Sequence, residues 1–257
     1  MGSVVSVLRE LVEALEARTP VVSATVVDTS RSVPRRPGSK MLVFGDGTIS
    51  GSIGGGEMEA RVIAEALGAL ADRRTRRLSY TLLEPATGDP GVCGGEVELY
   101  LEPHMPPTTL FVIGLGHVGR AVVELAAWTG FEVVAWDDRP ELATDLPDAR
   151  QLMSDSFAEA IAAFAPDAFT HAVMVTRNAA LDAELLPLLL STPVASVGLM
   201  GSRRRWDTTR AALEAAGVPA EDIARVRTPV GLEIAAETPR EIAVSILAEV
   251  VGLEHGA

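Results

Sequence analysis

Three glycines with the spacing Gly-x-Gly-x-x-Gly follow an apolar stretch of the chain, at Gly114, Gly116 and Gly119. In this pattern the first glycine makes a tight turn, the second lets a phosphate approach backbone N–H groups, and the third lets a helix pack closely on a strand. Asp137 follows at the distance where an acid accepts a hydrogen bond from a ribose hydroxyl. The spacing predicts a Rossmann turn that binds a nucleotide or another phosphate, unless the glycines serve packing alone. His117, inside the turn, either faces that phosphate or is a surface histidine.

A second glycine cluster, GSIGGGEME, occupies residues 51–59. Such a density of glycine is typical of a tight turn or of a backbone that a ligand approaches closely. Gly54, Gly55 and Gly56 directly precede a predicted helix that begins near Glu57, so their N–H groups could contact a ligand. Because no Gly-Lys-Ser/Thr follows, the cluster is not a Walker A loop.

Two basic segments are candidates for binding an anion. Arg35 and Lys40 lie on a loop punctuated by prolines, where they could meet a phosphate or form a solvated basic turn. Ser202 and Arg203 begin a predicted helix within GSRRR, residues 201–205. That segment is a second anion site, a partner surface or a solvated helix face.

The single cysteine, Cys93, lies beside Gly94 and Gly95. A thiolate is a soft ligand that suits molybdenum or sulfur chemistry, which makes Cys93 a candidate metal ligand. A small cysteine packed in a turn is an equally good interpretation. The four histidines lack zinc spacing and no Gly-x-Ser-x-Gly motif occurs, so neither a zinc site nor a hydrolase elbow is expected.

The elements that must position these residues change character along the chain. In the first half, residues 21–29 and 96–103 read as strands, 41–50 as a hairpin and 57–72 as a helix. An amphipathic helix is expected at the N-terminus, with one apolar face formed by Val4, Val7, Leu8, Leu11, Val12 and Leu15. These patterns predict a small α+β domain with an antiparallel sheet, residues 1–105.

Beyond the proline-rich segment 102–110, strands and helices alternate. Apolar strands are predicted at 109–114, 131–138, 171–176 and 194–201, each followed by a helical segment, and Thr238 begins the last helix with a capping box. Alternation of this kind predicts an α/β domain, a Rossmann-like doubly wound parallel sheet, over residues 106–257.

Composition restricts the class of protein. A net charge of −13 argues against nucleic-acid binding, and the absence of any run of 18 apolar residues argues against a membrane span. One cysteine among 257 residues fits a reducing cytoplasm, the expected location.

Read in order, several motifs resemble the XdhC/CoxI family, accessory proteins that mature molybdenum hydroxylases such as xanthine dehydrogenase. The resemblance runs through nearly the whole chain. It is carried by RSVPRRPGSKMLV (31–43), GSIGGGEMEA (51–60), GVCGGEVELYLEP (91–103), FVIGLGHVGRA (111–121), VVAWDDRPE (133–141), VGLMGSRRR (197–205) and TPVGLEIAAETPREIAVSILAEV (228–250).

The resemblance implies binding of the molybdenum cofactor, molybdopterin, a pterin dithiolene with a phosphate tail. It implies a chaperone rather than a catalyst, which presents the cofactor to a cysteine desulfurase for sulfuration and inserts it into an apo molybdenum hydroxylase of the xanthine dehydrogenase type. The family habit and the apolar last helix favour a homodimer. Where the family often has Thr-His-Asp-His, residues 176–179 read TRNA, which puts any metal or proton role of that loop in doubt.

Two other functions stay open. The Rossmann turn alone would suggest an NAD(P)-dependent oxidoreductase, and the acidic surface would suit a ligand-free scaffold that binds the hydroxylase. For the chaperone we expect the ligand cleft to lie between the two domains, where the two glycine turns gather. We also expect Gly54–Gly56 to form one wall of the cofactor site and residues 91–95 the facing wall.

Overall fold

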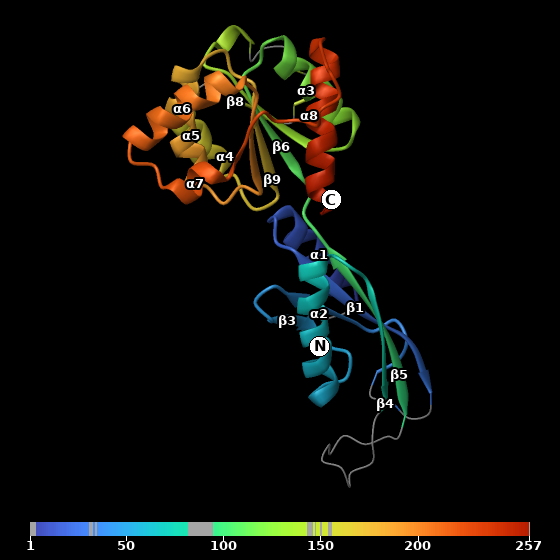
Figure 1. Cartoon of the computed structure of the whole chain (residues 1–257). Coiled ribbons are helices and arrows are strands. Elements are labelled where there is room, and N and C mark those ends of the chain that lie inside the picture. Colours follow the sequence, from blue (N-terminus) through green and yellow to red (C-terminus); the bar gives the residue numbers. More distant parts are fainter. Residues whose placement is uncertain are drawn as a thin grey trace. The chain divides into compact units, whose positions relative to one another are not determined.

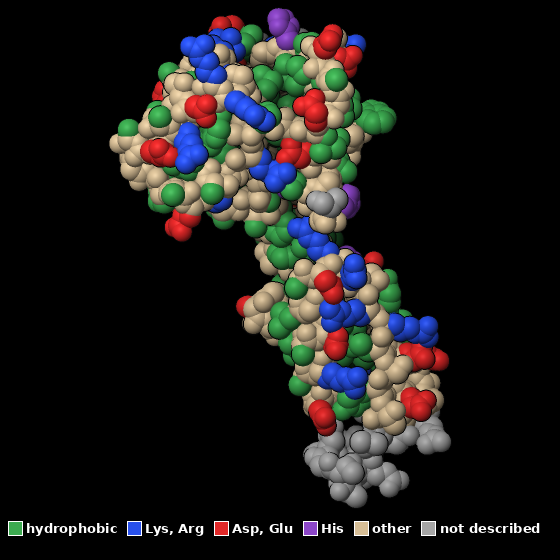
Figure 2. Space-filling model, viewed as in Figure 1, with side chains coloured by type: hydrophobic (Ala, Val, Ile, Leu, Met, Phe, Trp, Pro, Cys, Tyr) green, Lys and Arg blue, Asp and Glu red, His purple; other side chains and the backbone are tan. Residues whose placement is uncertain are grey.

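The computed structural model describes residues 4–30, 33, 35–81, 95–142, 146, 148–149, 151–153 and 156–256. The chain divides into two compact units, residues 1–106 and 107–257 (Figure 1). Each unit has its own sheet and its own hydrophobic core. Basic and acidic side chains are dispersed over the visible face of both units (Figure 2). Cys93 and Gly94 lie outside the described residues.

The N-terminal unit is built on a five-stranded antiparallel sheet with the order β3-β2-β1-β5-β4. Its strands are β1 (Val21–Ser30), β2 (Lys40–Phe44), β3 (Ile49–Gly51), β4 (Arg76–Thr81) and β5 (Glu96–His104). β2 and β3 form the hairpin that the sequence predicts, and the antiparallel sheet expected for this half is confirmed.

The two faces of this sheet pack against different helices. Because side chains alternate along a strand, Val22, Ala24 and Val26 of β1 face one core, whereas Val21 faces the other. The first core is completed by α2 (Gly56–Asp72) and the second by α1 (Val4–Glu16). The expected N-terminal helix is α1, and the sheet covers only part of its apolar face, because Val4, Leu8 and Val12 are exposed.

The C-terminal unit contains a six-stranded parallel sheet with the order β11-β10-β9-β6-β7-β8. The chain starts at β6 in the middle, adds β7 and β8 on one side, and then returns to add the other strands beyond β6. This is the doubly wound order, with its switch point between β6 and β9, and it confirms the predicted fold class. The strands are β6 (Thr109–Ile113), β7 (Glu132–Trp136), β8 (Gln151–Met153), β9 (Thr170–Met174), β10 (Ser196–Leu199) and β11 (Val226–Arg227).

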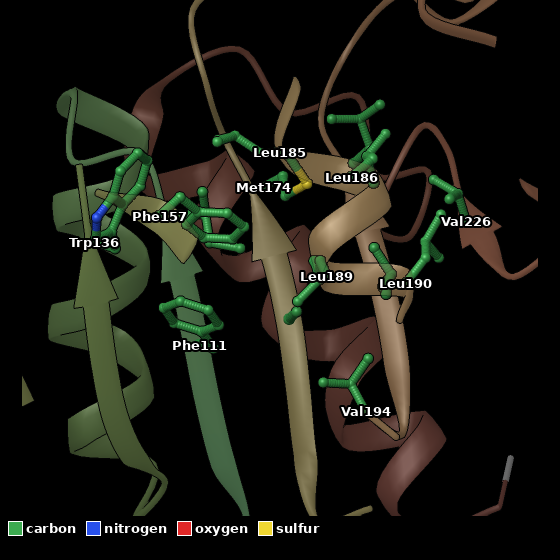
Figure 3. Packing of buried hydrophobic residues seen from close by; sticks show 14 of the residues in the cluster. Phe111, Trp136, Phe157, Met174, Leu185, Leu186, Leu189, Leu190, Val194 and Val226 are labelled. Carbon is green, nitrogen blue, oxygen red and sulfur yellow. The ribbon is translucent and has the colours of Figure 1, made fainter. Parts of the chain in front are cut away.

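Helices cover both faces of the parallel sheet, as a doubly wound fold requires. Residues Leu110 and Val112 of β6 pack in the core shared with α3 and α8, and Phe111 and Ile113 in the core shared with α4 and α5 (Figure 3). The helices are α3 (His117–Trp128), α4 (Phe157–Phe164), α5 (Ala179–Leu190), α6 (Arg203–Ala215), α7 (Ala220–Ala224) and α8 (Pro239–Glu254), with a 3₁₀ turn at Pro140–Leu142.

Local signals fix where the last helix begins. The Thr238 side chain accepts a hydrogen bond from the Glu241 N–H, and the Glu241 carboxylate accepts one from the Thr238 N–H. Pro239 takes the first helical position, where no N–H is needed. The predicted capping box is therefore confirmed. Within the described ranges, no helix has the length and apolar character that crossing a membrane requires.

Candidate functional site

The turn between β6 and α3 shows why two of its three glycines are required for packing. Gly114 has a φ of +100°, and a Cβ there would lie 2.9 Å from the Val175 carbonyl group. A Cβ on Gly119 would lie 1.9 Å from the Gly114 carbonyl oxygen. Gly116 differs, because a Cβ there would meet nothing within 4 Å. No side chain caps the first turn of α3, which begins at the exposed His117.

Asp137 joins the end of β7 to this turn. Its carboxylate accepts hydrogen bonds from the Leu115 N–H (2.6 Å), the Arg139 N–H (3.0 Å) and the Arg139 guanidinium (2.8 and 2.9 Å), and its side chain is 1% exposed. Burial acts to raise the pKa of Asp137, but the hydrogen bonds from Arg139 and Leu115 outweigh it, so the pKa is lowered. Asp137, which the sequence predicts to bind a ribose hydroxyl, is thus an ionised carboxylate that already pairs with Arg139.

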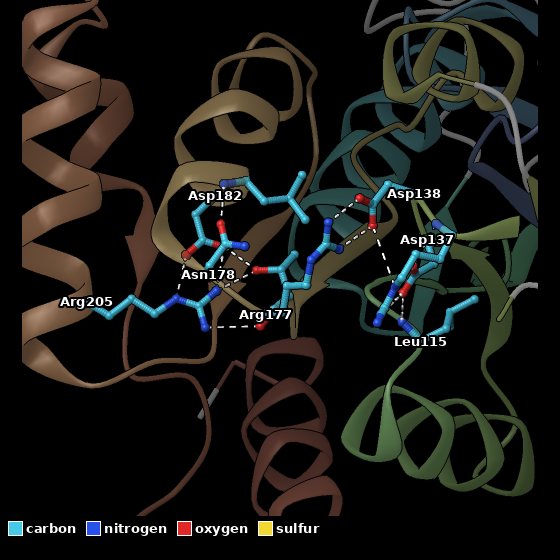
Figure 4. Close-up of polar contacts among 10 residues, drawn as sticks. Leu115, Asp137, Asp138, Arg177, Asn178, Asp182 and Arg205 are labelled. Carbon is cyan, nitrogen blue, oxygen red and sulfur yellow. Dashed lines mark hydrogen bonds and ion pairs between the residues drawn. The ribbon is translucent and has the colours of Figure 1, made fainter. Parts of the chain in front are cut away.

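A second ion pair links the loops that follow β7 and β9. Arg177 donates two hydrogen bonds of 2.6 Å to the carboxylate of Asp138, and hydrogen bonding to that carboxylate raises the pKa of Arg177. Figure 4 shows this pair lying between the groups around Asp137 and Asp182. Arg139 and Arg177 therefore bring two guanidinium groups to the carboxyl-terminal edge of the sheet.

A buried network fixes the start of α5 and α6. Arg205 donates to both oxygens of Asp182 at 2.7 and 2.8 Å, and to the hydroxyl and carbonyl oxygens of Thr176 at 2.6 and 3.0 Å. The Thr176 hydroxyl also donates to Asp182, which is fully buried (Figure 4). The loop that lacks the family histidines is thus held by an arginine from the neighbouring helix.

Ser202 and Arg203 were the residues predicted from the sequence in this region, and the side chain that makes these contacts was missed. Ser202 caps α6 by accepting a hydrogen bond from the Arg205 N–H at 3.3 Å, while Arg203 is exposed. The GSRRR motif indicates that this segment could bind an anion. It does not show which of its three arginines makes buried contacts, because that depends on Asp182, which binds Arg205. Arg139 and Arg177, whose guanidinium groups bind Asp137 and Asp138, were also missed.

In the N-terminal unit, a cavity of about 320 Å³ brings Arg35 and Lys40 together. Ser39 and Ser52 supply hydroxyl groups, Val4, Val7 and Gly51 complete the lining, and none of these residues is acidic. The Lys40 ammonium donates to the Thr25 hydroxyl at 2.8 Å. Arg35 has no hydrogen-bond or ion-pair partner among the described residues. The cavity therefore presents positive charge that is not neutralised by a carboxylate in its lining.

The glycine cluster at residues 51–56 forms a loop closed by a carboxylate. Glu59 Oε1 accepts hydrogen bonds from the N–H groups of Ile53 (3.1 Å), Gly54 (3.2 Å) and Gly55 (2.9 Å), and from the Ser52 hydroxyl (2.7 Å). Burial acts to raise the pKa of Glu59, yet the bonds from Ser52 and the backbone prevail and lower it. These N–H groups already have an acceptor, which the sequence alone did not indicate.

The backbone of this loop suits glycine alone. Gly54, Gly55 and Gly56 have φ values of +145°, +88° and +69°. A Cβ on Gly55 would point into open space, so the loop has a free side at that residue. Glu57, after the loop, is exposed. Ser52 belongs both to the loop and to the cationic cavity, which makes the two features neighbours.

The candidates thus form two groups, one in each unit. Arg35, Lys40 and the glycine loop lie together in the N-terminal unit, and the Rossmann turn with Asp137 lies in the C-terminal unit. Gly95 directly precedes β5. The cleft expected between the units stays a prediction.

In the part of the chain that the structure describes, no group of three or more His, Cys, Asp or Glu side chains could hold a metal ion.

Comparison with known families assigns both units. A model described as the XdhC Rossmann domain matches residues 110–250, more than half of the chain, and a model of the XdhC and CoxI family matches residues 14–81. The chain belongs to the XdhC/CoxI family. The Rossmann match begins in β6, includes the glycine turn and Asp137, and ends within the last helix, α8.

Three known proteins are similar in sequence to this chain. The chain is 37% identical to the Escherichia coli protein YqeB over 98% of its own length and 47% of YqeB, and 32% identical to a probable xanthine dehydrogenase subunit of Bacillus subtilis over 60% and 45%. This chain thus spans about half the length of these two relatives. The E. coli molybdenum cofactor insertion chaperone PaoD is 26% identical over 96% of this chain and 88% of PaoD.

A solved structure of similar fold covers almost the whole chain. It is described as a xanthine dehydrogenase from Bacillus halodurans, and it matches 96% of this XdhC/CoxI protein and 95% of its own chain. The TM-score is 0.52 at 23% identity, so this likeness shows the fold.

The packing at the Rossmann turn predicts opposite outcomes for two glycine-to-alanine changes. Gly119→Ala should lower the free energy of unfolding by about 2 kcal/mol, because the new methyl group must displace the Gly114 carbonyl. Gly116→Ala adds a methyl group in open space and should change it by less than about 0.5 kcal/mol. Urea denaturation of the two variants measures both values, and equal stability would contradict the close helix–strand packing.

The two aspartate–arginine pairs at this edge should differ in their contribution to stability. Asp182→Asn leaves the largely buried Arg205 without its ionic partner and should destabilise the protein by about 3 kcal/mol. Asp138→Asn disrupts a pair that water reaches and should cost less than about 1 kcal/mol. Thermal and urea unfolding measure the loss of stability in each variant. A larger loss for Asp138→Asn would contradict the role of the buried network in fixing the starts of α5 and α6.

Proposed function

We propose that this protein is a molybdenum cofactor-binding chaperone that supports sulfuration and insertion of the cofactor into a xanthine dehydrogenase-type hydroxylase. The observation that carries the proposal is the similarity to PaoD, a molybdenum cofactor insertion chaperone, along nearly the full length of both chains. The proposed partners are the apo-hydroxylase and a cysteine desulfurase. The family assignment of both units supports the same function.

The cationic cavity suits the phosphate tail of molybdopterin. A phosphate needs positive charge and hydrogen-bond donors, and the lining supplies the Arg35 guanidinium, the Lys40 ammonium and the hydroxyls of Ser39 and Ser52. When bound, the cofactor supplies the metal and dithiolene chemistry that the hydroxylase needs. The role of this chain is to hold the anion and to keep the glycine loop in shape beside it.

The glycine segments are proposed to contact the rest of the cofactor. The open side of Gly55 offers a surface without side chains, between Gly54 and Gly56, on which a flat pterin ring can lie. Cys93, with Gly94 and Gly95, is proposed to face the dithiolene and to provide a soft thiolate there. Glu57, at the start of α2, stands exposed beside this surface.

The Rossmann turn supports a second candidate activity, the binding of a nucleotide. Gly116 leaves its side of the turn open, and the first N–H groups of α3 lack a capping side chain, so a phosphate has both space and donors. His117 lies exposed at the same position. Dehydrogenase turnover is not expected from this edge, because its carboxylates at Asp137, Asp138 and Asp182 are each paired with an arginine.

Removing the positive charges of the cavity should abolish cofactor retention. The double variant Arg35→Gln/Lys40→Gln, co-expressed with the molybdenum-cofactor pathway, should retain at least tenfold less pterin and molybdenum than wild type, because two charge-assisted bonds to the phosphate are lost. The measurement is pterin fluorescence together with metal analysis of the purified protein.

Arg36→Gln is the matched control for the cavity, because Arg36 is exposed on the same loop and does not line the cavity. It should retain the cofactor like wild type. Full retention by the double variant would exclude the cavity as the phosphate site. A wild-type protein that retains neither pterin nor molybdenum would favour the ligand-free scaffold.

Blocking the Rossmann turn tests the second candidate. Gly116→Val should abolish binding of NAD⁺ or ADP-ribose, because its side chain occupies the space that a phosphate needs, while the fold survives. Isothermal calorimetry measures binding and thermal unfolding verifies the fold. Equal heats for wild type and variant would contradict a nucleotide site at this turn, and steady NADH oxidation that Gly116→Val eliminates would favour the oxidoreductase.

A further inference from the structure

We propose that the Rossmann turn selects a nucleotide whose ribose carries a 2′-phosphate, and that Arg139 and Arg177 bind this phosphate. The proposal rests on nucleotide binding at the turn, the second candidate activity above, and names the class of nucleotide. A nucleotide bound at such a turn places its ribose at the end of the second strand. That strand is β7, and the chain continues from it with Asp137, Asp138 and Arg139.

The carboxylate of Asp137 has no free position for a ribose hydroxyl. A carboxylate offers about four lone pairs to hydrogen-bond donors. They are taken by the backbone N–H groups of Leu115 and Arg139 and by the Nε and Nη2 groups of Arg139. The Asp137 side chain is also only 1% exposed. The acid that would accept a hydrogen bond from an unphosphorylated ribose is therefore already satisfied within the protein.

Two guanidinium groups are accessible at the same place. The Arg139 side chain is 37% exposed and the Arg177 side chain 45% exposed. Asp138 connects them, since its Oδ1 lies 2.6 Å from Nη1 of Arg177 and 3.9 Å from Nε of Arg139 (Figure 4). Hydrogen bonding to Asp137 raises the pKa of Arg139, while the charge of Arg177 acts to lower it, as expected for two cations that lie close together.

Each guanidinium keeps donors for a ligand. Arg139 binds Asp137 through Nε and Nη2, and Arg177 binds Asp138 through Nη1 and Nη2. The Nη1 group of Arg139 and the Nε group of Arg177 have no acceptor among the described residues. A phosphate accepts several charge-assisted hydrogen bonds from such groups, whereas a ribose hydroxyl in the same place leaves its own proton without an acceptor. The donors therefore favour the phosphorylated ribose.

Asp138 competes with this phosphate for Arg177. Because water reaches the pair of Asp138 and Arg177, a ligand can displace the carboxylate at little cost. Removing the negative charge of Asp138 should then strengthen binding of the phosphorylated nucleotide. The opposite sign is expected if a carboxylate at this edge accepted a hydrogen bond from a ribose hydroxyl.

The test compares NADP⁺ with NAD⁺ by isothermal titration calorimetry on the full chain. NADP⁺ should bind about tenfold more tightly or better, because charge-assisted bonds to the added phosphate are gained. Arg177→Gln should remove about that factor from the affinity for NADP⁺ and leave the affinity for NAD⁺ unchanged. Asp138→Asn should raise the preference for NADP⁺, because it removes the carboxylate that competes for Arg177.

Arg210→Gln is the matched control, because it breaks an exposed arginine–carboxylate pair on α6 and changes the net charge equally. It should leave the ratio of the two affinities unchanged. NAD⁺ that binds as tightly as NADP⁺, or a ratio that Arg177→Gln does not alter, would overturn the proposal while nucleotide binding stands. Binding of neither nucleotide would overturn the second candidate activity together with this proposal. Cofactor retention by the cationic cavity is measured separately and does not affect the result.

Discussion

The hydrogen bond from the Leu115 N–H to the carboxylate of Asp137 determines how the Rossmann half is organised at its functional edge. It joins the turn after the first strand to the end of the second strand, and the Gly114 N–H bond to the Trp136 carbonyl oxygen lies beside it. With the turn fixed in this way, α3 can begin at His117 and approach the strand as closely as Gly119 allows. The arginine pairs of the neighbouring loops are arranged around this fixed point.

Both units use an internal carboxylate to hold a glycine-rich turn. Glu59 does so for the loop at residues 51–56, as Asp137 does for the turn after β6. In each case backbone N–H groups donate to a buried or half-buried acid, and a side-chain hydrogen bond, from Ser52 or Arg139, together with these backbone bonds lowers the pKa of that acid despite its burial. Both turns are therefore shaped before any ligand arrives, and the first N–H groups of α3 still have no capping side chain.

Features encoded by neighbouring residues were predictable from the sequence, and features that depend on distant residues were not. The parallel sheet, the hairpin of β2 and β3 and the capping box at Thr238 follow from periodicity and short-range motifs. The contact between Arg205 and Asp182 could not be inferred, because the two residues lie 23 positions apart on different helices. In addition, GSRRR contains three chemically identical side chains. The exposed face of α1 was missed because an amphipathic pattern shows which side is apolar, not how much of that side the sheet covers.

The closure of the glycine loop by Glu59 has a kinetic consequence for a protein proposed to pass its cargo to another. A loop that is already ordered loses little conformational entropy when a ligand binds, so association is not slowed by a folding step. The same carboxylate places a fixed negative charge next to Ser52, at the border of the cavity proposed for a phosphate. Repulsion between like charges would shorten the residence time of a phosphate bound there. Under the proposed function, this single glutamate would therefore favour both fast capture and ready release of the cofactor.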